Sequence, residues 1–492
     1  MEIVPAAGEA EKLGTEFLVL GVFCDGPLMG SARAVNNRSA GRLAAILDQA
    51  GLGEAVGATF LIGKLPGVAA QRLLLVGLGY AGRFSDKAYR QALAAVAMAL
   101  NDDPVAEVVV TLAENEVPRR SLSWRMQQAA RILADGRFDF GLPDGNLRDE
   151  KRTITLLVPQ ALTSELVGAL RQGVAIGEGV SFAKELGDLS PNLCTPDFIA
   201  RTVRAMSNQF GFRVDVLGRN EFEKHGMTTF LARENAVAGA CKLFVMRSDH
   251  RKAAGRPIVL IGDGVAAQQA PAKQKAAALS PACEMHGIGS VLGAMRTVER
   301  LGLALNVVGL IVASQGETSR NDGDDGHRAQ DPSLLGDVLG YAAHFSPSCV
   351  IAVAALTRAS FVALGSHASG LFANDEGLAS ELLKCGGISG DGVWQLPLWE
   401  DDPPLPPGRT AEADHEIEAP TDAIAAASNL ARFATAYPWA HLDIAGTAST
   451  AQRSRSTGRP VPLLAEFLVG RARAVPGHAT FPRRSSRNCI HE

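Results

Sequence analysis

Three short apolar runs in the second half of the sequence most constrain the fold. They lie at 257–262, 306–313 and 349–355, and helix-like stretches such as 290–301 separate them. Runs of this kind are typical of strands buried on both faces, and strands that alternate with helices build parallel sheets. We therefore expect an α/β unit with a mixed, mainly parallel sheet covered by helices.

The first 150 residues also alternate strand-like and helix-like segments, which predicts a smaller N-terminal α/β domain. Strands are expected at 17–23, 58–62, 73–76, 107–112 and 154–158, and helices at 40–50, 87–100 and 124–133. Between 164 and 186 the apolar positions recur at helical spacing, which indicates a long helix joining two domains. The expected divisions are 1–163, a linking helix at 164–190, a C-terminal domain at 191–472 and a basic tail at 473–492.

Composition excludes several classes of protein. Hydrophobic residues make up 47% of the 492 residues and charged ones 20%, which is typical of a globular chain with a large core. No apolar run approaches the roughly 18 residues that a bilayer span needs, and no signal peptide is recognisable, so we expect no membrane partner and a cytoplasmic location. Seven scattered cysteines without a CxxC pair fit a reducing compartment.

Several segments resemble the C-terminal domain of the leucine aminopeptidase family, the two-metal cytosolic aminopeptidases. The more specific ones are 389–399 (SGDGVWQLPLW) and 439–448 (WAHLDIAGTA), and weaker ones are 189–196, 306–310 and 370–375. The resemblance covers nearly the whole chain and implies the family's fold, a macro-like N-terminal domain and a homo-hexamer. It also implies peptide hydrolysis by two divalent metals, which polarise the carbonyl and generate hydroxide.

The first metal-binding segment of the family departs from its pattern in this chain. The family pattern G-K-G-x-T-F-D-x-G-G-x-x-x-K-P supplies a ligand lysine, a ligand aspartate and a catalytic lysine. Residues 262–275 here read GDGVAAQQAPAKQK. The resemblance therefore puts Asp263 in place of the ligand lysine and Gln268 in place of the aspartate, while Lys275 is a vestige of the catalytic lysine.

The remaining ligand segments depart as well. The family's next aspartate corresponds to Glu284, which retains a carboxylate on a side chain one methylene longer. The family motif N-T-D-A-E-G-R corresponds to 326–332 (GHRAQDP), which puts Arg328 at the aspartate, Gln330 at the glutamate and Pro332 at the arginine. A cation thus replaces a ligand for a dication, and an amide cannot replace a bridging carboxylate.

The departures cluster at the pocket, whereas the strand segments 306–311 and 441–445 keep the family pattern. We therefore predict a pseudoenzyme: an aminopeptidase-like protein without peptidase activity, a functional catalytic residue or a bound metal, which serves as a structural or regulatory oligomer. Its partners would be identical subunits or, in a mixed hexamer, an active relative. Losing the nucleophile and the oxyanion stabilisation together is a cooperative loss.

Two other functions stay open. A residual or rebuilt amide hydrolase would use zinc or manganese, held by side chains of segments expected to converge: Asp263, Cys283, Glu284, His286 and His327. A DNA-binding regulator would use the arginine-rich end of the chain and would show an affinity that falls steeply with salt.

Three further features of the sequence are expected to be structural and not functional. The acidic loop at 322–325 lacks the acidic residue that a calcium loop needs at its twelfth position. The GxGxxG sequence at 77–82 follows a strand, but such a motif alone is weak evidence for nucleotide binding. His441 and Asp443 are expected to serve packing.

Overall fold

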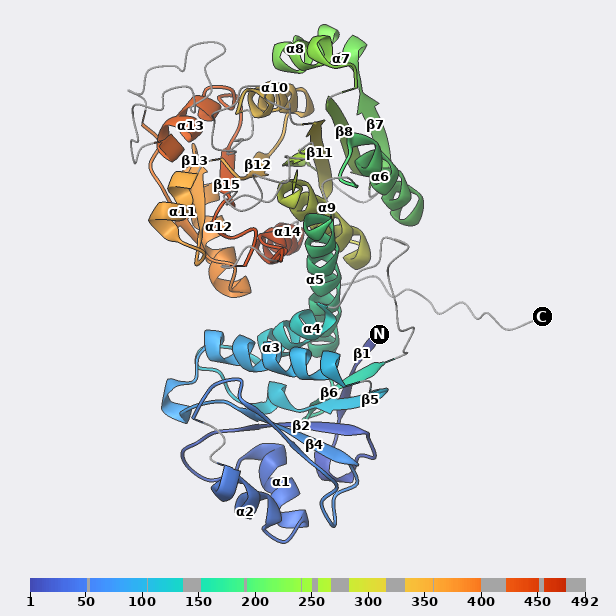
Figure 1. The fold of residues 1–492 in the computed structure, drawn as a ribbon, viewed down its shortest axis with the longest axis vertical. Helices are drawn as coiled ribbons and strands as arrows, with labels where there is room; N and C mark the ends of the chain where they lie inside the picture. Colours follow the sequence, from blue (N-terminus) through green and yellow to red (C-terminus); the bar gives the residue numbers. More distant parts are fainter. Residues whose placement is uncertain are drawn as a thin grey trace, which may run out of the picture. The chain divides into compact units, whose positions relative to one another are not determined.

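The computed structural model divides into two compact units, Met1–Glu178 and Gly179–Glu492, each of which is described by itself (Figure 1). The residues that the structure describes are 1–50, 54–103, 105–135, 152–189, 193–239, 241–249, 255–266, 283–315, 332–356, 358–399, 422–450 and 455–474.

The N-terminal unit is a six-stranded sheet with helices on both faces. The strand order is β1-β6-β5-β2-β4-β3, and every neighbouring pair is parallel except β4 with β3. The strands are β1 (Glu2–Ala7), β2 (Phe17–Val22), β3 (Thr59–Ile62), β4 (Arg72–Gly77), β5 (Glu107–Val110) and β6 (Thr153–Val158). The helices are α1 (Gly30–Arg38), α2 (Arg42–Ala50), α3 (Asp86–Asp102) and α4 (Leu122–Ala134).

Because side chains alternate along each strand, the core of this unit lies partly on each face of the sheet. Leu18, Leu20, Leu73 and Leu75 pack with residues of α1 and α2, and α3 and α4 lie together on the opposite face (Figure 1). Serine caps start both helices of that second face, since Ser85 Oγ accepts from Ala88 N and Ser121 Oγ accepts from Trp124 N.

The glycine-rich turn after β4 is held by a carboxylate of the protein itself. The Ala81 amide donates to Asp25 Oδ1 at 2.7 Å, and α3 begins only at Asp86. A dinucleotide site needs a helix that starts directly at the glycine turn, with its amides free for phosphate. The turn therefore has a structural role.

Helix α5 (Ser164–Asp188) confirms the long helix expected from apolar spacing. Its glycines set how closely it packs: a Cβ on Gly173 or Gly177 would come within 3.0 Å of the α4 backbone, at Gln127 O and Arg131 O respectively. Small residues at these positions are therefore required by the helix contact rather than by a turn.

The C-terminal unit contains a nine-stranded mixed sheet of order β14-β13-β15-β12-β9-β11-β8-β7, with β10 paired to β9. Strands β15, β12, β9 and β11 are mutually parallel in the centre, and antiparallel pairs lie toward the edges. The strands are β7 (Arg213–Leu217), β8 (Cys241–Asp249), β9 (Ile258–Ala266), β10 (Cys283–Glu284), β11 (Asn306–Gln315), β12 (Cys349–Ala354), β13 (Ser369–Ala373), β14 (Val393–Gln395) and β15 (Trp439–Asp443).

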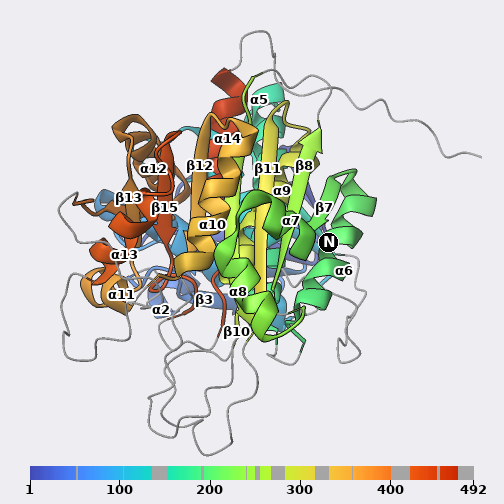
Figure 2. The same ribbon diagram turned by 90° about the horizontal axis from the view of Figure 1, so that it is seen from above.

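Helices cover both faces of this sheet (Figure 2). A large core cluster joins one face to α7, α8, α10 and α13, while α9 packs on the other face and against α14. The helices are α6 (Pro196–Phe210), α7 (Arg219–His225), α8 (Thr228–Ala236), α9 (His286–Leu301), α10 (Pro332–Ala342), α11 (Arg358–Leu364), α12 (Glu376–Ser389), α13 (Asp422–Ala431) and α14 (Val461–Ala474).

The expected fold class is confirmed: two α/β units, the larger with a mixed sheet that is parallel at its centre. The expectations missed β1 and α1, and they began α9 four residues late. Within the part of the chain that the structure describes, no helix is both long and apolar enough to cross a membrane. The expected domain limits at 163, 190 and 472 remain predictions.

Candidate functional site

The candidate site lies where the central parallel strands of the C-terminal unit end. Strands β11, β9, β12 and β15 run side by side in the same direction, so their carboxyl ends meet at one edge of the sheet. Ligands of open α/β sheets bind at such an edge. Asp263 lies near the end of β9, and Asp443 is the last residue of β15.

Register puts these two aspartates on the same face. Gly262 pairs with Val353, so the next residues, Asp263 and Ala354, are also neighbours, and Ala354 pairs with Asp443. At the usual spacing between strands the two aspartate backbones are roughly 10 Å apart. Both residues are only 1% exposed. Because side chains alternate, Asp263 faces the same side as Val259 and Ile261, toward the large core cluster.

The glycines beside Asp263 allow α9 to approach the strand. A Cβ on Gly262 would come within 3.0 Å of Gly287 O, and one on Gly287 would come within 3.0 Å of both Asp263 O and Val353 O. The start of α9 is therefore clamped against the backbones of β9 and β12. This contact keeps the edge of the sheet in shape without a metal ligand.

The same clamp brings the Glu284 backbone to the site. Strand β10 pairs antiparallel with β9, so that Glu284 lies opposite Val265 and Cys283 opposite Ala266. Asp263 and Glu284 therefore belong to adjacent strand segments. The side chains of Cys283 and Glu284 lie outside the described residues.

His286 is engaged in a network of its own. Its Nε2 lies 3.0 Å from Ser456 Oγ, and the Ser456 amide donates to Asp188 Oδ1 at 2.6 Å. Burial lowers the pKa of His286 to about 4, although the Asp188 charge opposes the shift. The neutral ring thus ties the start of α9 to the end of α5 and to residue 456.

Asp443 fixes the loop that follows β12. Its carboxylate accepts hydrogen bonds from Ser360 Oγ at 2.6 Å, Leu356 N at 3.2 Å and Ala445 N at 3.1 Å. His441, two residues earlier on the same face, is fully buried, and burial lowers its pKa to about 3. Asp443 thus has a structural role through its hydrogen bonds, and His441 is enclosed in the core.

An ion pair between the partly exposed Arg459 and a buried aspartate links the neighbouring loops, and sequence reasoning missed it. Arg459 Nε donates to Asp391, and the other guanidinium nitrogens donate to the carbonyls of Ser366, His367 and Gly392 at 3.1–3.3 Å. The Asp391 side chain is 3% exposed. Asp391 lies in the 389–399 motif, but nothing in the sequence indicates its partner 68 residues away.

The predicted ligand positions are only partly described. Gln268, Lys275, Arg328 and Gln330 lie outside the described residues, as do His327 and the acidic loop at 322–325. Among the side chains that are described, no group of three or more His, Cys, Asp and Glu is placed to hold a metal ion. The assignment of the degenerate ligand positions therefore stays a prediction.

Two family models and several curated proteins match this chain. The model of the cytosol aminopeptidase family catalytic domain matches residues 181–322 and 333–465, and the model of the family's N-terminal domain matches residues 19–141. A protein from Azoarcus sp. (strain BH72) named "Probable cytosol aminopeptidase" is 42% identical, over 96% of this chain and 99% of its own. A protein of the same name from Aromatoleum aromaticum is 39% identical, over 97% of this chain and 100% of its own.

Solved structures show the same fold. A mutant of tomato leucine aminopeptidase superposes with a TM-score of 0.77 at 20% identity, covering 96% of each chain. The bottromycin maturation enzyme BotP in complex with Mn superposes with a TM-score of 0.73 at 23% identity, covering 93% of this chain and 100% of its own.

Proposed function

The chain belongs to the cytosol aminopeptidase family, and from that premise we propose that it is a member without peptidase activity, which serves as a structural or regulatory subunit. The fold and the family are shared with enzymes. What differs in this chain is the set of residues at the positions where those enzymes bind metal.

The donor chemistry at these positions carries the proposal. The five positions assigned by resemblance hold two carboxylates, two amides and one guanidinium: Asp263, Glu284, Gln268, Gln330 and Arg328. Two divalent metals need hard, anionic ligands, some of which bridge the ions, and a guanidinium repels a dication and cannot coordinate it. These residues do not fit the family's metal pair, so no reaction step is assigned to it.

The contacts around the same positions indicate that the edge of the sheet has kept its shape. Gly262 and Gly287 keep the close contact between β9 and α9, and Asp443 keeps its three hydrogen bonds. Neither feature depends on a metal. A fold held by its own sheet and helix contacts is able to outlast the loss of the metals.

A structural role requires assembly. We propose a hexamer, composed of identical chains or mixed with an active relative, in the cytoplasm. The family to which the chain belongs and the word "cytosol" in the names of its relatives support this. Light scattering would test it, because a hexamer has six times the mass of one chain, and co-purification with the active relative would identify a mixed assembly.

A residual or rebuilt hydrolase is the second candidate, and the relatives favour it. A relative that is 42% identical is named a probable cytosol aminopeptidase, and a neighbour in fold is a complex with Mn. In this alternative Asp263, Glu284 and the nearby His and Cys residues would hold zinc or manganese, and Lys275 would serve as the catalytic residue.

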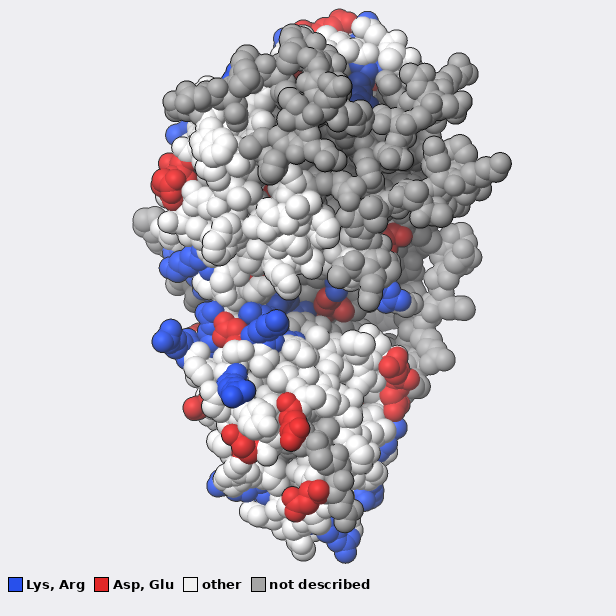
Figure 3. Space-filling model, turned by 60° about the vertical axis from the view of Figure 1, so that its left-hand side comes forward, with Lys and Arg blue, Asp and Glu red and all other residues white. Residues whose placement is uncertain are grey.

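DNA binding is the weaker alternative. Arg471, at the start of the arginine-rich end, is paired with Glu381 at 2.7 Å, which neutralises part of its charge. On the face drawn in Figure 3, acidic and basic side chains are interspersed over the lower, N-terminal unit. A protein that binds nucleic acid by charge usually gathers its cations into one field.

A hydrolysis assay separates the first two candidates. The chain and the Azoarcus relative are purified in parallel and tested on leucine p-nitroanilide with added manganese or zinc. We expect a kcat/KM at least about 10⁴-fold below that of the relative, because the nucleophile and the oxyanion stabilisation are lost together. Turnover within about tenfold of the relative would refute the pseudoenzyme and support a rebuilt site.

A further inference from the structure

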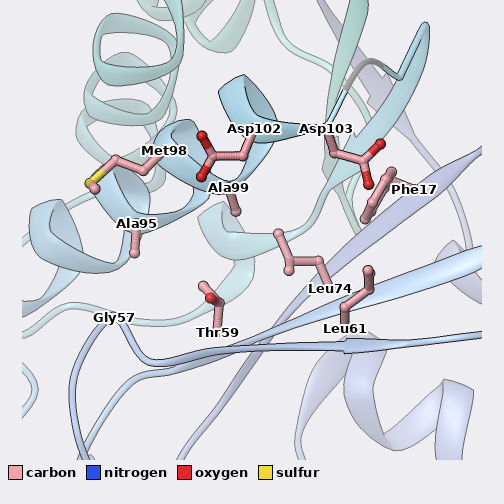
Figure 4. Close-up of a pocket in the computed structure, with 10 residues that line it drawn as sticks. All are labelled: Phe17, Gly57, Thr59, Leu61, Leu74, Ala95, Met98, Ala99, Asp102 and Asp103. Carbon is pink, nitrogen blue, oxygen red and sulfur yellow. The ribbon is translucent and has the colours of Figure 1, made fainter.

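A pocket of about 530 Å³ lies in the N-terminal unit (Figure 4). Its two walls are helix α3 and the strands β2, β3 and β4. The helix wall consists of Ala95, Met98, Ala99, Asp102 and Asp103, and the strand wall includes Thr59, Leu61, Leu74 and Phe17. In Figure 4 the strand side chains point toward the helix. The volume lies within the range of small-molecule sites.

Small side chains on α3 create this space. Ala95 and Ala99 are four residues apart and so occupy the same face of the helix. Opposite them, Leu74 and Phe17 form a floor that is 4% and 2% exposed. Two methyl groups facing a leucine and a phenylalanine leave a gap that larger side chains would fill. The result is an apolar trough between the helix and the sheet.

The trough opens at the end of the sheet that β3 forms. Among the described residues, β3 is the last strand of the order and pairs with β4 alone. Two apolar side chains of its lining are exposed: Leu61 is 48% exposed and Met98 69%. Such a concentration of exposed apolar groups around a hollow is typical of a binding site.

Two aspartates stand at the end of α3. Asp102 is its last residue and Asp103 its C-cap, and the last turn contains no basic residue. The Asp103 carbonyl accepts a hydrogen bond from Arg152 Nη2 at 3.1 Å. Asp103 is compensated, because Arg72 Nη1 donates to its carboxylate at 2.8 Å while the guanidinium lies over the Phe17 ring. Asp102 is exposed and forms no ion pair within the described part of the chain.

We propose that this pocket binds a small organic cation. The apolar body of the ligand packs between Ala99 of α3 and Leu61 and Leu74 of the strands. Its ammonium or guanidinium group lies at the exposed Asp102 carboxylate, which forms no ion pair with any side chain that the structure describes. The site is independent of the chemistry in the C-terminal unit, so its test stands whether or not that unit is a peptidase.

Isoamylamine and isoamyl alcohol form a matched pair of probes with the same hydrocarbon body, of which only the amine is charged. Saturation-transfer difference NMR detects their binding to the full chain, and titration at low salt gives their dissociation constants. We expect the amine to bind up to about fivefold more tightly than the alcohol, because an ion pair at an exposed carboxylate contributes little more. That preference should shrink as salt is added.

Two variants locate the site. Asp102→Asn removes the charge at constant size and should make the two probes equal. Ala99→Phe fills the trough and should abolish binding of both. Glu116→Gln removes another exposed carboxylate of the same unit and should change nothing. Thermal unfolding of each variant confirms that it is folded.

Two results would overturn the proposal. One is an amine that binds no better than the alcohol to the native protein, or that does not bind at all. The other is a preference for the amine that survives in Asp102→Asn. Since Asp102→Asn alters only an exposed side chain, the proposal stays testable even if Ala99→Phe fails to fold.

Discussion

Replacing Gly287 with alanine should destabilise the C-terminal unit by about 2 kcal/mol. The added Cβ would come within 3.0 Å of two backbone oxygens, Asp263 O and Val353 O, on the adjacent central strands β9 and β12. Neither oxygen can rotate away as a side chain would, so α9 has to move off the sheet. Overpacking typically costs about 1–3 kcal/mol, and a clash with two backbone oxygens puts this site at about 3 kcal/mol. The better helix propensity of alanine returns about 1 kcal/mol, which leaves a net loss of about 2 kcal/mol.

The matched control is Gly470→Ala, on helix α14. Gly470 is exposed, and a Cβ there meets nothing within 4 Å. This variant gains helix propensity without a clash, so we expect it to be more stable by up to about 1 kcal/mol.

Urea unfolding followed by circular dichroism measures both variants against the native chain, in buffer with and without a chelator. The two glycine changes should shift the midpoint in opposite directions, and the chelator should alter neither shift. A Gly287→Ala protein as stable as the native one would refute the view that this contact between helix and strand holds the edge of the sheet.

Three further predictions concern buried polar groups. Burial depresses the pKa of His441 to about 3 in the folded state, whereas the ordinary histidine pKa is 6.5. Between pH 6.5 and 3 the unfolded chain therefore binds more protons than the folded one. Stability should therefore fall as the pH drops from 6.5 toward 3, and His441→Phe should flatten that profile in acid unfolding. Arg459→Met should cost about 3–5 kcal/mol in urea unfolding, because it leaves the Asp391 carboxylate buried and unpaired. Ser360→Ala should lower the free energy of unfolding by about 1–3 kcal/mol in the same assay, because it removes a buried hydrogen-bond donor to Asp443. A decrease no larger than that caused by replacing an exposed serine would argue against a structural role for this hydrogen bond.

Local patterns in the sequence predicted the elements that carry strong periodicity. Helix α5 was recognisable because its apolar positions recur at helical spacing over 25 residues. Helix α1 was missed because only Ala32 and Val35 are buried in it, which is too few to make a stripe. Strand β1 was missed because its partner, β6, lies about 150 residues further along the chain and its residues are only partly buried.

The candidate site was likewise predictable from the sequence only in part. Resemblance assigned Asp263 and Glu284 to converging segments, and the pairing of β9 with β10 brings those segments together. The contacts that fix the surroundings were not predictable, because they join residues far apart in the sequence. Ser360 and Asp443 are separated by 83 residues, and His286 and Ser456 by 170. No spacing rule connects such pairs.

The most direct test of the central claim is the metal content of the protein, purified without chelator and measured by elemental mass spectrometry. A chain whose ligand positions hold Gln268, Arg328 and Gln330 should retain less than about a tenth of a metal ion per chain, even after incubation with manganese or zinc. One or more tightly bound ions per chain would contradict the account and identify a rebuilt metal site.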